Sequence, residues 1–517
     1  PICSAGSGLS LSRTSSRYGC TYQLCCCAKL PSMGEEKQTF DEKKAALMVM
    51  ELRDTFRSGK TKSYEWRVSQ LKSLVKMIEE KESEILQALY KDLSKPKLEA
   101  FISEVHAVKS ASNLALKELK SWMKPEKVKT NMSTYPSSAE ILPEPLGVVL
   151  VISAWNYPFL LSLDPVVGAI AAGNAVVLKP SEISPATSST IARLLAEYLD
   201  NSTIRVIEGA VPETTALLEQ KWDKIFFTGG GRVGRIVMSA AARHLTPVTL
   251  ELGGKNPVVV DSNVDVEVAA RRIVAGKWAA NCGQICIGVD YIVTTKKFAP
   301  KLIDVLRNKI EEFFGKDPTE SSDQSRIVNS FHFRRLANLL DEVSDKIVVG
   351  GQRDESRLKI APTILLDVPE NAQIMQEEIF GPLLPIITVE NLEECFGIIE
   401  AKPKPLSAYL FTNDQRLKKK FVQNVSAGGI AINDTILQVA QPNLPFGGVG
   451  ESGMGCYHGK FSFDAFTHRK PVLYRIFARD SSVRYPPYTP KKEKIMRALL
   501  SGNLLRIILT LLGWSRD

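Results

Sequence analysis

Histidine and cysteine are both scarce in the main part of this 517-residue chain. It has only five histidines, and five of its nine cysteines lie within the first 27 residues. The other 490 residues (517 less 27) hold four cysteines, which excludes the disulfide framework of a small secreted domain. This distribution indicates a reducing compartment and leaves room for a reactive thiol. With so few histidines, a cysteine–histidine hydrolase is a poor interpretation.

Acidic side chains are missing from residues 1–33, a serine-rich stretch that contains Arg13, Arg17 and Lys29. The stretch has no long apolar run, so a secretory signal is not indicated, and its composition is typical of an organelle transit peptide. We expect residues 1–40 to be such a peptide, with a plain disordered tail as the alternative. Composition alone does not separate the chloroplast from the mitochondrion.

The positive charge is confined to the two ends of the chain. The net charge is +9, of which residues 1–33 supply +3 and residues 476–517, with eight basic and three acidic side chains, supply +5. About +1 is left for residues 34–475, whereas a nucleic-acid-binding protein usually carries its basic stripe on the folded core. No nucleic-acid partner is therefore expected.

The basic tail 476–517 contains one apolar stretch, residues 498–514, which Asn503 and Arg506 interrupt. It is shorter than the roughly 20 residues of a membrane-spanning helix. Its leucine and isoleucine residues recur at helical spacing, which predicts a terminal helix packed on the body of the protein. The alternative is an amphipathic helix that lies on a membrane surface, helped by the basic residues of 491–497.

Apolar and charged residues that alternate at helical periods predict two to four amphipathic helices over residues 40–125. Residues 147–153 are a continuous apolar run of strand length, typical of a strand covered on both faces of a parallel sheet. From there strand and helix patterns alternate to residue 314, which predicts an α/β fold with a doubly wound sheet. Further strands are expected at 175–178, 202–207, 224–227, from 256 and at 290–295, and helices at 164–172, 184–200, 264–280 and 299–314.

The thiol best placed for chemistry is Cys286, at the end of the segment Asn-Cys-Gly-Gln-Ile-Cys. A cysteine flanked by glycine and polar residues is less typical of core packing, although most free cysteines are buried and inert. Cys282, four residues earlier, is interpreted as a tolerated small side chain. The sharper hypothesis is that it pairs with or shields Cys286 under oxidation.

Several polar groups follow directly after predicted strands, where the crevice of an open α/β sheet lies. Asn156 follows the strand at 147–153, and Lys179 and Glu182 follow the next strand, where they could hold the ribose of a cofactor. Each has an ordinary alternative as a turn residue or a solvated strand end. Glu251, between two apolar strands, could act as a general base if it faces the site, or could be an exposed loop acid.

A glycine-rich turn at 229–234 precedes a predicted helix. Glycines let the backbone approach a phosphate closely, and the amino end of a helix attracts negative charge. The segment matches neither the dinucleotide-binding fingerprint Gly-x-Gly-x-x-Gly nor a phosphate-binding loop. A purely structural turn is therefore an equal alternative.

Together and in this order, these segments resemble the aldehyde dehydrogenase superfamily over roughly residues 42–490. Residues 377–382 and 444–455 extend the resemblance, and residues 457–468 look like the class 3 branch. Residues 288–291 and 484–488 look plant-like. The resemblance implies an aldehyde dehydrogenase-like fold with a Rossmann-like cofactor domain, a catalytic α/β domain and a bridging oligomerisation arm. It also implies a homodimer, a role in detoxification and stress response, and a chloroplast location ahead of mitochondrion or cytoplasm.

The resemblance implies NAD(P)-dependent oxidation of aldehydes to carboxylic acids, with medium- or long-chain aliphatic substrates for this class. Cys286 matches the nucleophile that forms a hemithioacetal and then a thioester, Asn156 the donor that holds the oxyanion, and Glu251 the base. The cofactor-binding residues are matched by Lys179, Glu182, Gly229, Gly230, Gly231, Arg232, Val233, Gly234, Glu378 and Phe380. An acidic group near the ribose favours NAD, with NADP also possible, and no metal is implied.

The implied domains are a dinucleotide-binding domain (41–129 and 148–252), a catalytic domain (253–425), bridging segments (130–147 and 426–475) and the tail. Two other functions remain open. One is a CoA-acylating dehydrogenase, in which CoA rather than water takes the acyl group. The other is a non-catalytic dinucleotide-binding protein.

Overall fold

The computed structural model describes residues 40–131, 134, 136–478 and 480–512. The transit peptide expected at residues 1–40 lies outside the described residues, apart from its last position.

The helices that precede the first large sheet are α1 (Glu42–Arg57), α2 (Tyr64–Leu93), α3 (Lys97–Ala100) and α4 (His106–Trp122). Side-chain oxygens cap the first two, because Asp41 accepts the Lys44 N–H at 2.9 Å and Ser63 accepts the Trp66 N–H at 3.1 Å. The buried leucines and isoleucines of α2 recur every three or four residues along one face. The amphipathic helices predicted for this region are therefore confirmed.

Six strands form the first large sheet, in the order β17-β7-β6-β3-β4-β5. They are β3 (Val148–Ile152), β4 (Ala175–Lys179), β5 (Ile204–Val206), β6 (Lys224–Thr228), β7 (Val248–Glu251) and β17 (Gly453–Met454). All neighbours run parallel except β17, which is antiparallel to β7. The strands β4 and β5 lie on one side of β3, and β6 and β7 lie on the other, so the order of the strands reverses at β3. A doubly wound sheet opens its crevice at such a switch point.

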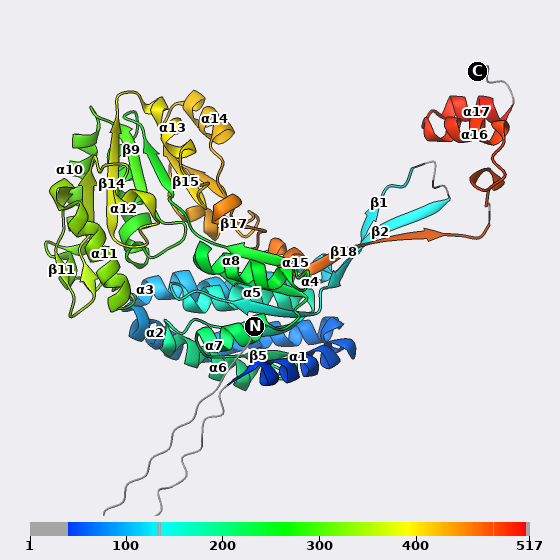
Figure 1. Ribbon diagram of the computed structural model, residues 1–517, viewed down its shortest axis with the longest axis horizontal. Helices are drawn as coiled ribbons and strands as arrows, with labels where there is room; N and C mark the ends of the chain where they lie inside the picture. Colours follow the sequence, from blue (N-terminus) through cyan, green and yellow to red (C-terminus); the bar gives the residue numbers. More distant parts are fainter. Residues whose placement is uncertain (1–39, 132–133, 135, 479, 513–517) are drawn as a thin grey trace, which may run out of the picture. The chain divides into compact units, whose positions relative to one another are not determined.

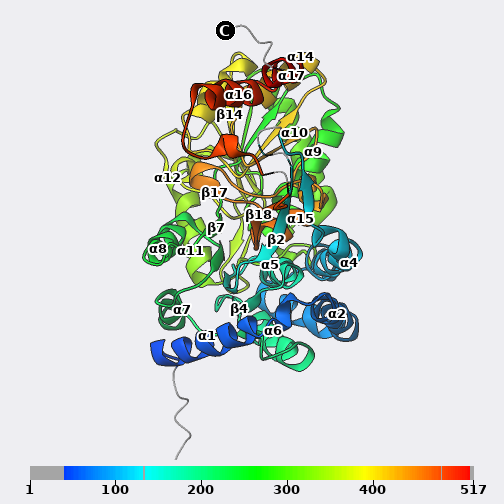
Figure 2. The same cartoon turned by 90° about the vertical axis from the view of Figure 1, so that its right-hand side faces the viewer.

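Helices cover both faces of this sheet, which explains the uninterrupted apolar run in β3. Val149 and Val151 pack with α2, α4, α5 (Pro158–Ala172) and α6 (Pro185–Tyr198). Val148 and Leu150 pack with α1, α7 (Val211–Leu218) and α8 (Gly231–Ala242). Figure 2 shows α1 alongside α7 and α2 alongside α6. The predicted doubly wound α/β architecture is confirmed.

Seven strands form the second large sheet, in the order β10-β13-β14-β9-β8-β15-β16 (Figure 1). They are β8 (Pro257–Val260), β9 (Tyr291–Thr295), β10 (Ile347–Val349), β13 (Thr363–Leu366), β14 (Leu383–Val389), β15 (Ser407–Phe411) and β16 (Gly429–Ile432). Helices α9 (Val266–Val274) and α10 (Ala299–Phe314) pack on one face. Helices α13 (Cys395–Glu400) and α14 (Gln415–Asn424) pack on the other. The remaining elements of this region are α11 (Ser330–Glu342), β11 (Arg353–Asp354), β12 (Lys359–Ile360) and α12 (Gln373–Gln376).

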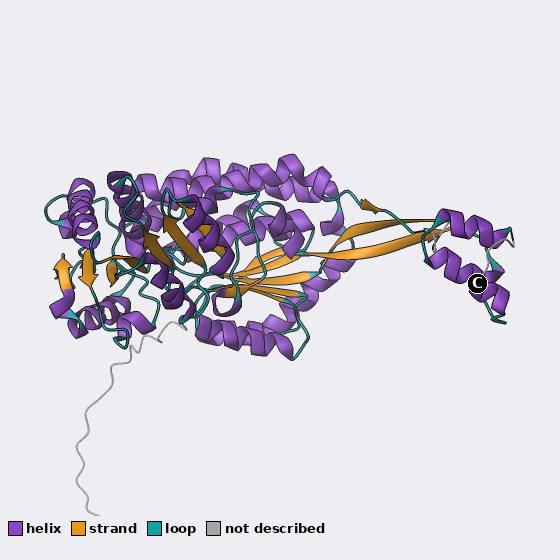
Figure 3. Cartoon of the chain, turned by 90° about the horizontal axis from the view of Figure 1, so that it is seen from above, coloured by secondary structure: helices purple, strands orange, loops and turns teal. Residues whose placement is uncertain are grey.

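A small antiparallel sheet is made by β1 (Glu126–Val128), β2 (Ser137–Pro145) and β18 (Thr467–Arg475), which follows α15 (Lys460–Ala465). β2 and β18 pair along their full length (Figure 3). The segment 426–475, expected as a bridging segment, contributes one strand to each of the two large sheets and one to the small antiparallel sheet. Only β18 belongs to the small one, whereas β16 and β17 complete the two large sheets.

The tail forms two helices, α16 (Pro490–Leu500) and α17 (Leu504–Leu511), so the stretch 498–514 that was predicted as one helix is divided. Gly502 breaks the helix with φ +67°. The two helices pack on each other and Ala498 and Ile507 are buried, while Leu500 and Ile508 stay 67% and 46% exposed. Among the described residues, no helix has the length and apolar character needed to cross a membrane.

Candidate active site

Most of the predicted site residues lie at the carboxyl ends of parallel strands. Asn156 follows β3, Lys179 ends β4, Glu251 ends β7, and the glycine turn 229–234 follows β6. Parallel strands place these groups along one edge of the six-stranded sheet, around its switch point. Cys286 approaches from the other large sheet, on the loop that precedes β9.

The loop that carries Cys286 is held by its neighbours. Asn256 Nδ2 donates to the carbonyl oxygens of Cys286 and Gly288, at 2.8 and 2.9 Å. Gly283 has φ +77°, and a side chain there would meet the carbonyl oxygen of Gly381 at 2.3 Å. The start of the loop therefore requires glycine for both its conformation and its space.

The Cys286 thiol lies in a setting that disfavours ionisation. Burial raises its pKa to about 12, and the carboxylates of Glu378 and Glu251 act in the same direction. Burial also raises the pKa of Glu378 to about 8. In this form of the protein the thiol is protonated at neutral pH, so a reaction needs a group that accepts its proton.

Glu251 is a buried carboxyl with no hydrogen bond. It is 2% exposed, and neither of its oxygens has a partner among the residues that the structure describes. Burial raises its pKa well above the usual range. An unpaired buried carboxyl is costly to keep, and a raised pKa makes it a better proton acceptor near neutral pH.

Asn156 is 3% exposed and reaches the loop of the thiol. Its side-chain Nδ2 donates to the carbonyl oxygen of Gln284 at 3.0 Å, two residues before Cys286. One of the two amide hydrogens remains available for another acceptor. Asn156, Glu251 and Cys286 are thus brought together at one place.

Glu378 lies within the segment 374–379 and Phe380 directly follows it, and a buried ion pair fixes the backbone of this segment. Lys255 Nζ bonds the Asp290 carboxylate and donates to two main-chain carbonyl oxygens of the segment, at 2.8 and 2.9 Å. Asp290 accepts a main-chain N–H of the same segment at 2.9 Å. The pair was not predicted from the sequence, and it fixes the backbone next to two residues that were.

Phe380 also belongs to an aromatic cluster between the two large domains. Its backbone has φ +50°, and its ring stands edge-on to Trp155, with centroids 5.3 Å apart. Trp155 in turn lies 5.0 Å from the ring of His332 on α11. Trp155 directly precedes Asn156, so the cluster links the oxyanion candidate to the opposite domain.

Lys179 and Glu182 form an ion pair at the carboxyl end of β4. Lys179 Nζ donates to a Glu182 oxygen at 2.7 Å. The lysine side chain is 3% exposed and the glutamate side chain 43% exposed, so the pair presents its acidic end to solvent. An exposed carboxylate here could accept hydrogen bonds from ribose hydroxyls and would repel a phosphate.

The glycine turn leads directly into α8. A side chain at Gly229 would meet the Phe227 ring at 2.5 Å, whereas nothing lies within 4 Å of one at Gly230, the residue that precedes the helix. Arg232 and Val233 are exposed. The turn therefore offers free backbone N–H groups at the start of a helix, the arrangement that binds phosphate groups.

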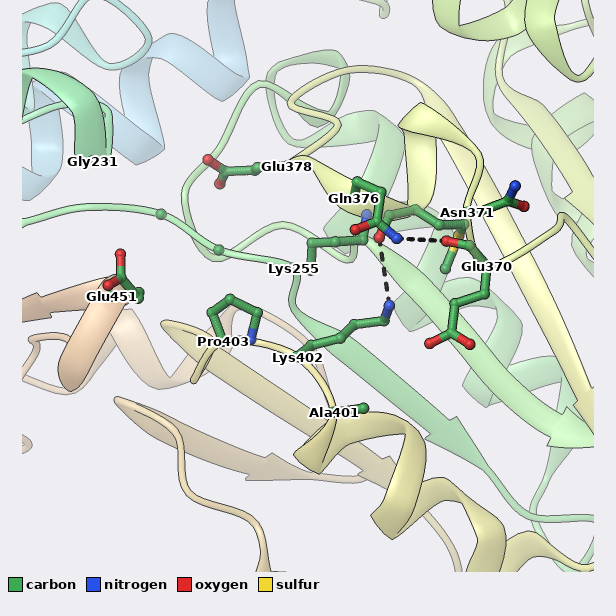
Figure 4. Close-up of a pocket in the computed structure, with 13 residues that line it drawn as sticks. Gly231, Lys255, Glu370, Asn371, Gln376, Glu378, Ala401, Lys402, Pro403 and Glu451 are labelled. Carbon is green, nitrogen blue, oxygen red and sulfur yellow. Dashed lines mark hydrogen bonds between the residues drawn. The ribbon is translucent and has the colours of Figure 1, made fainter.

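A cavity of about 470 Å³ lies between the two large sheets (Figure 4). It is lined by Gly231 of α8, by Gly253 and Gly254 after β7, and by Glu378 and Lys402 from the opposite domain. A helix amino end without side chains on one wall and polar groups on the other fit a dinucleotide. The described residues contain no cluster that could hold a metal ion.

Cys282 faces a different environment from Cys286. It packs in an apolar cluster with residues such as Phe333 and Leu336, and its Sγ accepts a hydrogen bond from Gln324 Nε2 at 3.2 Å. Burial raises its pKa to about 12. Cys282 is 1% exposed whereas Cys286 is partly exposed, and this difference favours the interpretation of Cys282 as a packing residue.

Three charged residues between α2 and α4 also reach the site, and none was predicted. Lys95 and Glu104 are completely buried, and Glu99 contacts the loop before Cys286. Charged residues in amphipathic helices usually face solvent, so the pattern gave no warning. The local feature that accompanies these residues is the break after α2, where Ser94 has φ +49°.

Comparison with known proteins was consistent across sequence and structure. The model of the aldehyde dehydrogenase family matches residues 33–472. The chain is 65% identical to "Aldehyde dehydrogenase family 3 member I1, chloroplastic" of Arabidopsis thaliana over 495 residues, 95% of this chain and 90% of that protein.

Two solved structures extend the comparison. The substrate-bound state of Staphylococcus aureus AldH is 44% identical, with a TM-score of 0.86 over 88% of this chain and 99% of that one. Glyceraldehyde-3-phosphate dehydrogenase GapN from Methanocaldococcus jannaschii, complexed with NADP, is 27% identical. Its TM-score is 0.76, over 86% of this chain and 96% of that one.

Proposed function

We propose roles for individual residues from the premise that this chain belongs to the aldehyde dehydrogenase family, in its class 3 branch. It is an NAD(P)-dependent enzyme that oxidises aldehydes to carboxylic acids. Cys286 is the nucleophile, Glu251 the base and Asn156 the oxyanion donor. The observation that carries this assignment is the unpaired, buried Glu251 carboxyl beside a protonated thiol.

The reaction begins when the Cys286 sulfur attacks the aldehyde carbon while Glu251 accepts the thiol proton. The carbonyl oxygen becomes an oxyanion that the free N–H of the Asn156 amide and the Cys286 backbone N–H can hold. A nicotinamide held by Glu378 and Phe380 would supply the acceptor for the hydride that leaves the hemithioacetal carbon. A thioester remains on Cys286, and Glu251 passes the thiol proton to solvent. Glu251 then deprotonates the water that cleaves the thioester, and it returns that proton to the departing thiolate as the acid is released.

The test is reduction of NAD or NADP by the full chain with octanal under reducing conditions. Cys286→Ala should abolish the reaction, and Cys282→Ala, which removes a neighbouring thiol of the same size, should retain it. Equal loss in both variants would show that the assignment of the nucleophile is wrong. Adding CoA separates the acylating alternative, because acyl-CoA would then replace the free acid as product.

For the cofactor, the exposed carboxylate of Glu182 supports a preference for NAD over NADP. Lys179 would bind the adenosine end of the cofactor, and the glycines Gly229, Gly230, Gly231 and Gly234 would bind its diphosphate. Glu378 and Phe380 would contact the nicotinamide end. Arg232 and Val233, whose side chains are exposed, would contribute only main-chain groups. Glu182→Gln should lower the ratio of kcat/KM for NAD to that for NADP. An unchanged ratio would remove the basis for the preference.

Medium- to long-chain aliphatic aldehydes are the substrates we propose, on the basis of the class 3 relationship. A series from propanal through octanal to dodecanal tests this proposal. The value of kcat/KM should rise with chain length, since each buried methylene contributes about 0.8 kcal/mol. A flat or falling series would contradict it.

A homodimer built through the small sheet is supported by unpaired features of the chain. β16 is an edge strand of the seven-stranded sheet, and the end of β18 carries exposed Leu473 and Tyr474, with Phe477 just beyond. Such apolar groups and open strand edges usually find a partner. Sedimentation equilibrium should give twice the mass of the chain, 57.1 kDa, and a single-chain mass would contradict the proposal.

Chloroplast location and peripheral membrane contact complete the proposal. The location is supported by the relative whose name reads chloroplastic, and import of a fluorescent fusion tests it. Membrane contact is supported by the exposed Leu505, Ile508 and Leu512 of the basic tail. Flotation with anionic lipid vesicles should depend on residues 476–517. The domain boundaries of 41–129 with 148–252, 253–425, and 130–147 with 426–475 also remain part of the proposal.

A further inference from the structure

A buried lysine lies directly behind the loop that presents Asn156. Lys95 follows α2, and its side chain is completely shielded from solvent. Its Nζ donates to the main-chain carbonyl oxygen of Asn156 at 3.0 Å and to the Glu104 carboxylate. It also lies 3.9 Å from the centre of the Tyr157 ring, where the ring face attracts a cation. The ammonium thus contacts two successive residues of the site loop.

Glu104 balances this charge and holds the next part of the same loop. It too is completely shielded from solvent. Its second oxygen accepts the main-chain N–H groups of Phe159 and Leu160, at 2.9 and 3.3 Å. These N–H groups belong to the first turn of α5, where no intrahelical partner exists and negative charge is favoured. Lys95 and Glu104 therefore fix the backbone on both sides of Tyr157.

A second donor acts on the same carbonyl oxygen from the opposite domain. Asn281 Nδ2 donates to the Asn156 carbonyl oxygen at 2.8 Å, and the Asn281 N–H donates to Glu99 at 2.7 Å. Two donors on one carbonyl oxygen set the orientation of the peptide plane that follows Asn156. This plane and the side-chain bond from Asn156 to Gln284 together determine where the free amide hydrogen points.

Stability alone does not account for a buried ion pair at this position. Replacing such a pair with uncharged groups of similar volume is often neutral or stabilising. The reason is that the free-energy cost of removing two charges from water roughly cancels the attraction between them. A methionine in place of Lys95 would fill the same space but could not donate to the Asn156 carbonyl oxygen. The geometry points to Lys95 as a positioning residue, and we propose that it orients the Asn156 amide for the oxyanion. This inference rests on the oxyanion role proposed for Asn156.

The test compares kcat for octanal oxidation in the wild type and in Lys95→Met/Glu104→Gln. The double variant removes both charges of the pair together, and the glutamine that replaces Glu104 could still accept the N–H groups of α5. Displacement of the Asn156 amide by about an ångström would cost on the order of 100-fold in rate, so kcat should fall by about that factor. The affinity for NAD, measured by fluorescence quenching, should not change. Lys309→Met is the matched control, since Lys309 is also largely buried and paired with a glutamate, but on α10.

A structural role is separated from positioning by combining the variant with Asn156→Ala. If Lys95 acts through Asn156, the combined variant should be no slower than Asn156→Ala alone. Additive losses, or a kcat within about threefold of wild type in the double variant, would overturn the inference while leaving the role of Asn156 intact. An unchanged kcat in Asn156→Ala would overturn the proposed oxyanion role as well.

A conservative replacement covers the case in which the double variant does not fold. Lys95→Gln retains a side-chain N–H donor, one bond shorter in reach than the lysine ammonium, and, as a neutral group, it needs no counter-charge. Paired with Glu104→Gln, it should keep most of the wild-type kcat. A loss as large as that of Asn156→Ala, with NAD affinity intact, would contradict the positioning role.

Discussion

The thiol of Cys286 should react slowly with alkylating agents in the enzyme without cofactor. Burial and two neighbouring carboxylates raise its pKa to about 12, three units above the ordinary 9.0. The thiolate fraction at a given pH should therefore be about 1,000-fold smaller than for a free thiol. A more basic thiolate is intrinsically more reactive, by roughly 0.4–0.5 log unit per pKa unit. The net deficit at pH 8 should then be roughly 30- to 60-fold.

The assay is alkylation by iodoacetamide, followed by the mass of the peptide that contains Cys286, with N-acetylcysteine as the free thiol. The logarithm of the rate should rise with a slope of one from pH 7 to pH 10. Glu378→Gln should accelerate the reaction above about pH 8, where Glu378 is ionised, because its carboxylate disfavours the thiolate. A plateau below pH 9, or a rate close to that of N-acetylcysteine at pH 8, would refute the reasoning.

Three further outcomes are expected from buried charged groups. Glu251→Gln should slow both steady-state turnover and the stopped-flow burst of reduced cofactor by about 100-fold or more, because thiol attack and thioester hydrolysis both lose their base. Burial raises the pKa of Glu99 from 4.5 to about 7, so its contribution to stability is present below pH 4.5 and is lost as pH rises through 7. Glu99→Gln should remove that loss, and its Tm should gain on the wild type between pH 5 and pH 8; parallel Tm curves would contradict this. Lys255→Met should destabilise by about 3–5 kcal/mol in urea unfolding, and Lys255→Met/Asp290→Asn should recover most of it.

The sequence predicted the sheets well because their strands are enclosed on both faces. In β3 successive valines and leucines face opposite helix layers, so every position is apolar and the run stands out. Helix ends were harder to place. The helix expected at 164–172 begins at Pro158, since proline is tolerated in a first turn, and it continues through Pro165. In the tail, the periodicity of apolar residues predicted one continuous helix, but Gly502 divides it into two.

The site residues that follow strands could be predicted from the sequence. Those that hold the site loops through hydrogen bonds to main-chain atoms could not. Asn156, Lys179 and Glu251 end or follow strands, so the topology of a parallel sheet gathers them at one edge. Lys95 comes from the end of a helix with ordinary amphipathic character. Its burial depends on the packing of α2 against α5, which no local pattern specifies.

Two of the buried lysines around the site, Lys95 and Lys255, act in the same way on opposite sides of it. Lys95 donates to a main-chain carbonyl oxygen of the Asn156 loop, and Lys255 donates to two in the segment before Glu378. Each is paired with a carboxylate that accepts main-chain N–H groups of the same stretch. Both ion pairs bind main-chain atoms, so they do not require particular side chains in the loops. The loop sequences therefore contain no motif that would reveal these pairs. Substitutions in these loops that preserve the backbone should therefore keep both clamps, whereas loss of either lysine should disturb a loop whose own sequence is unchanged.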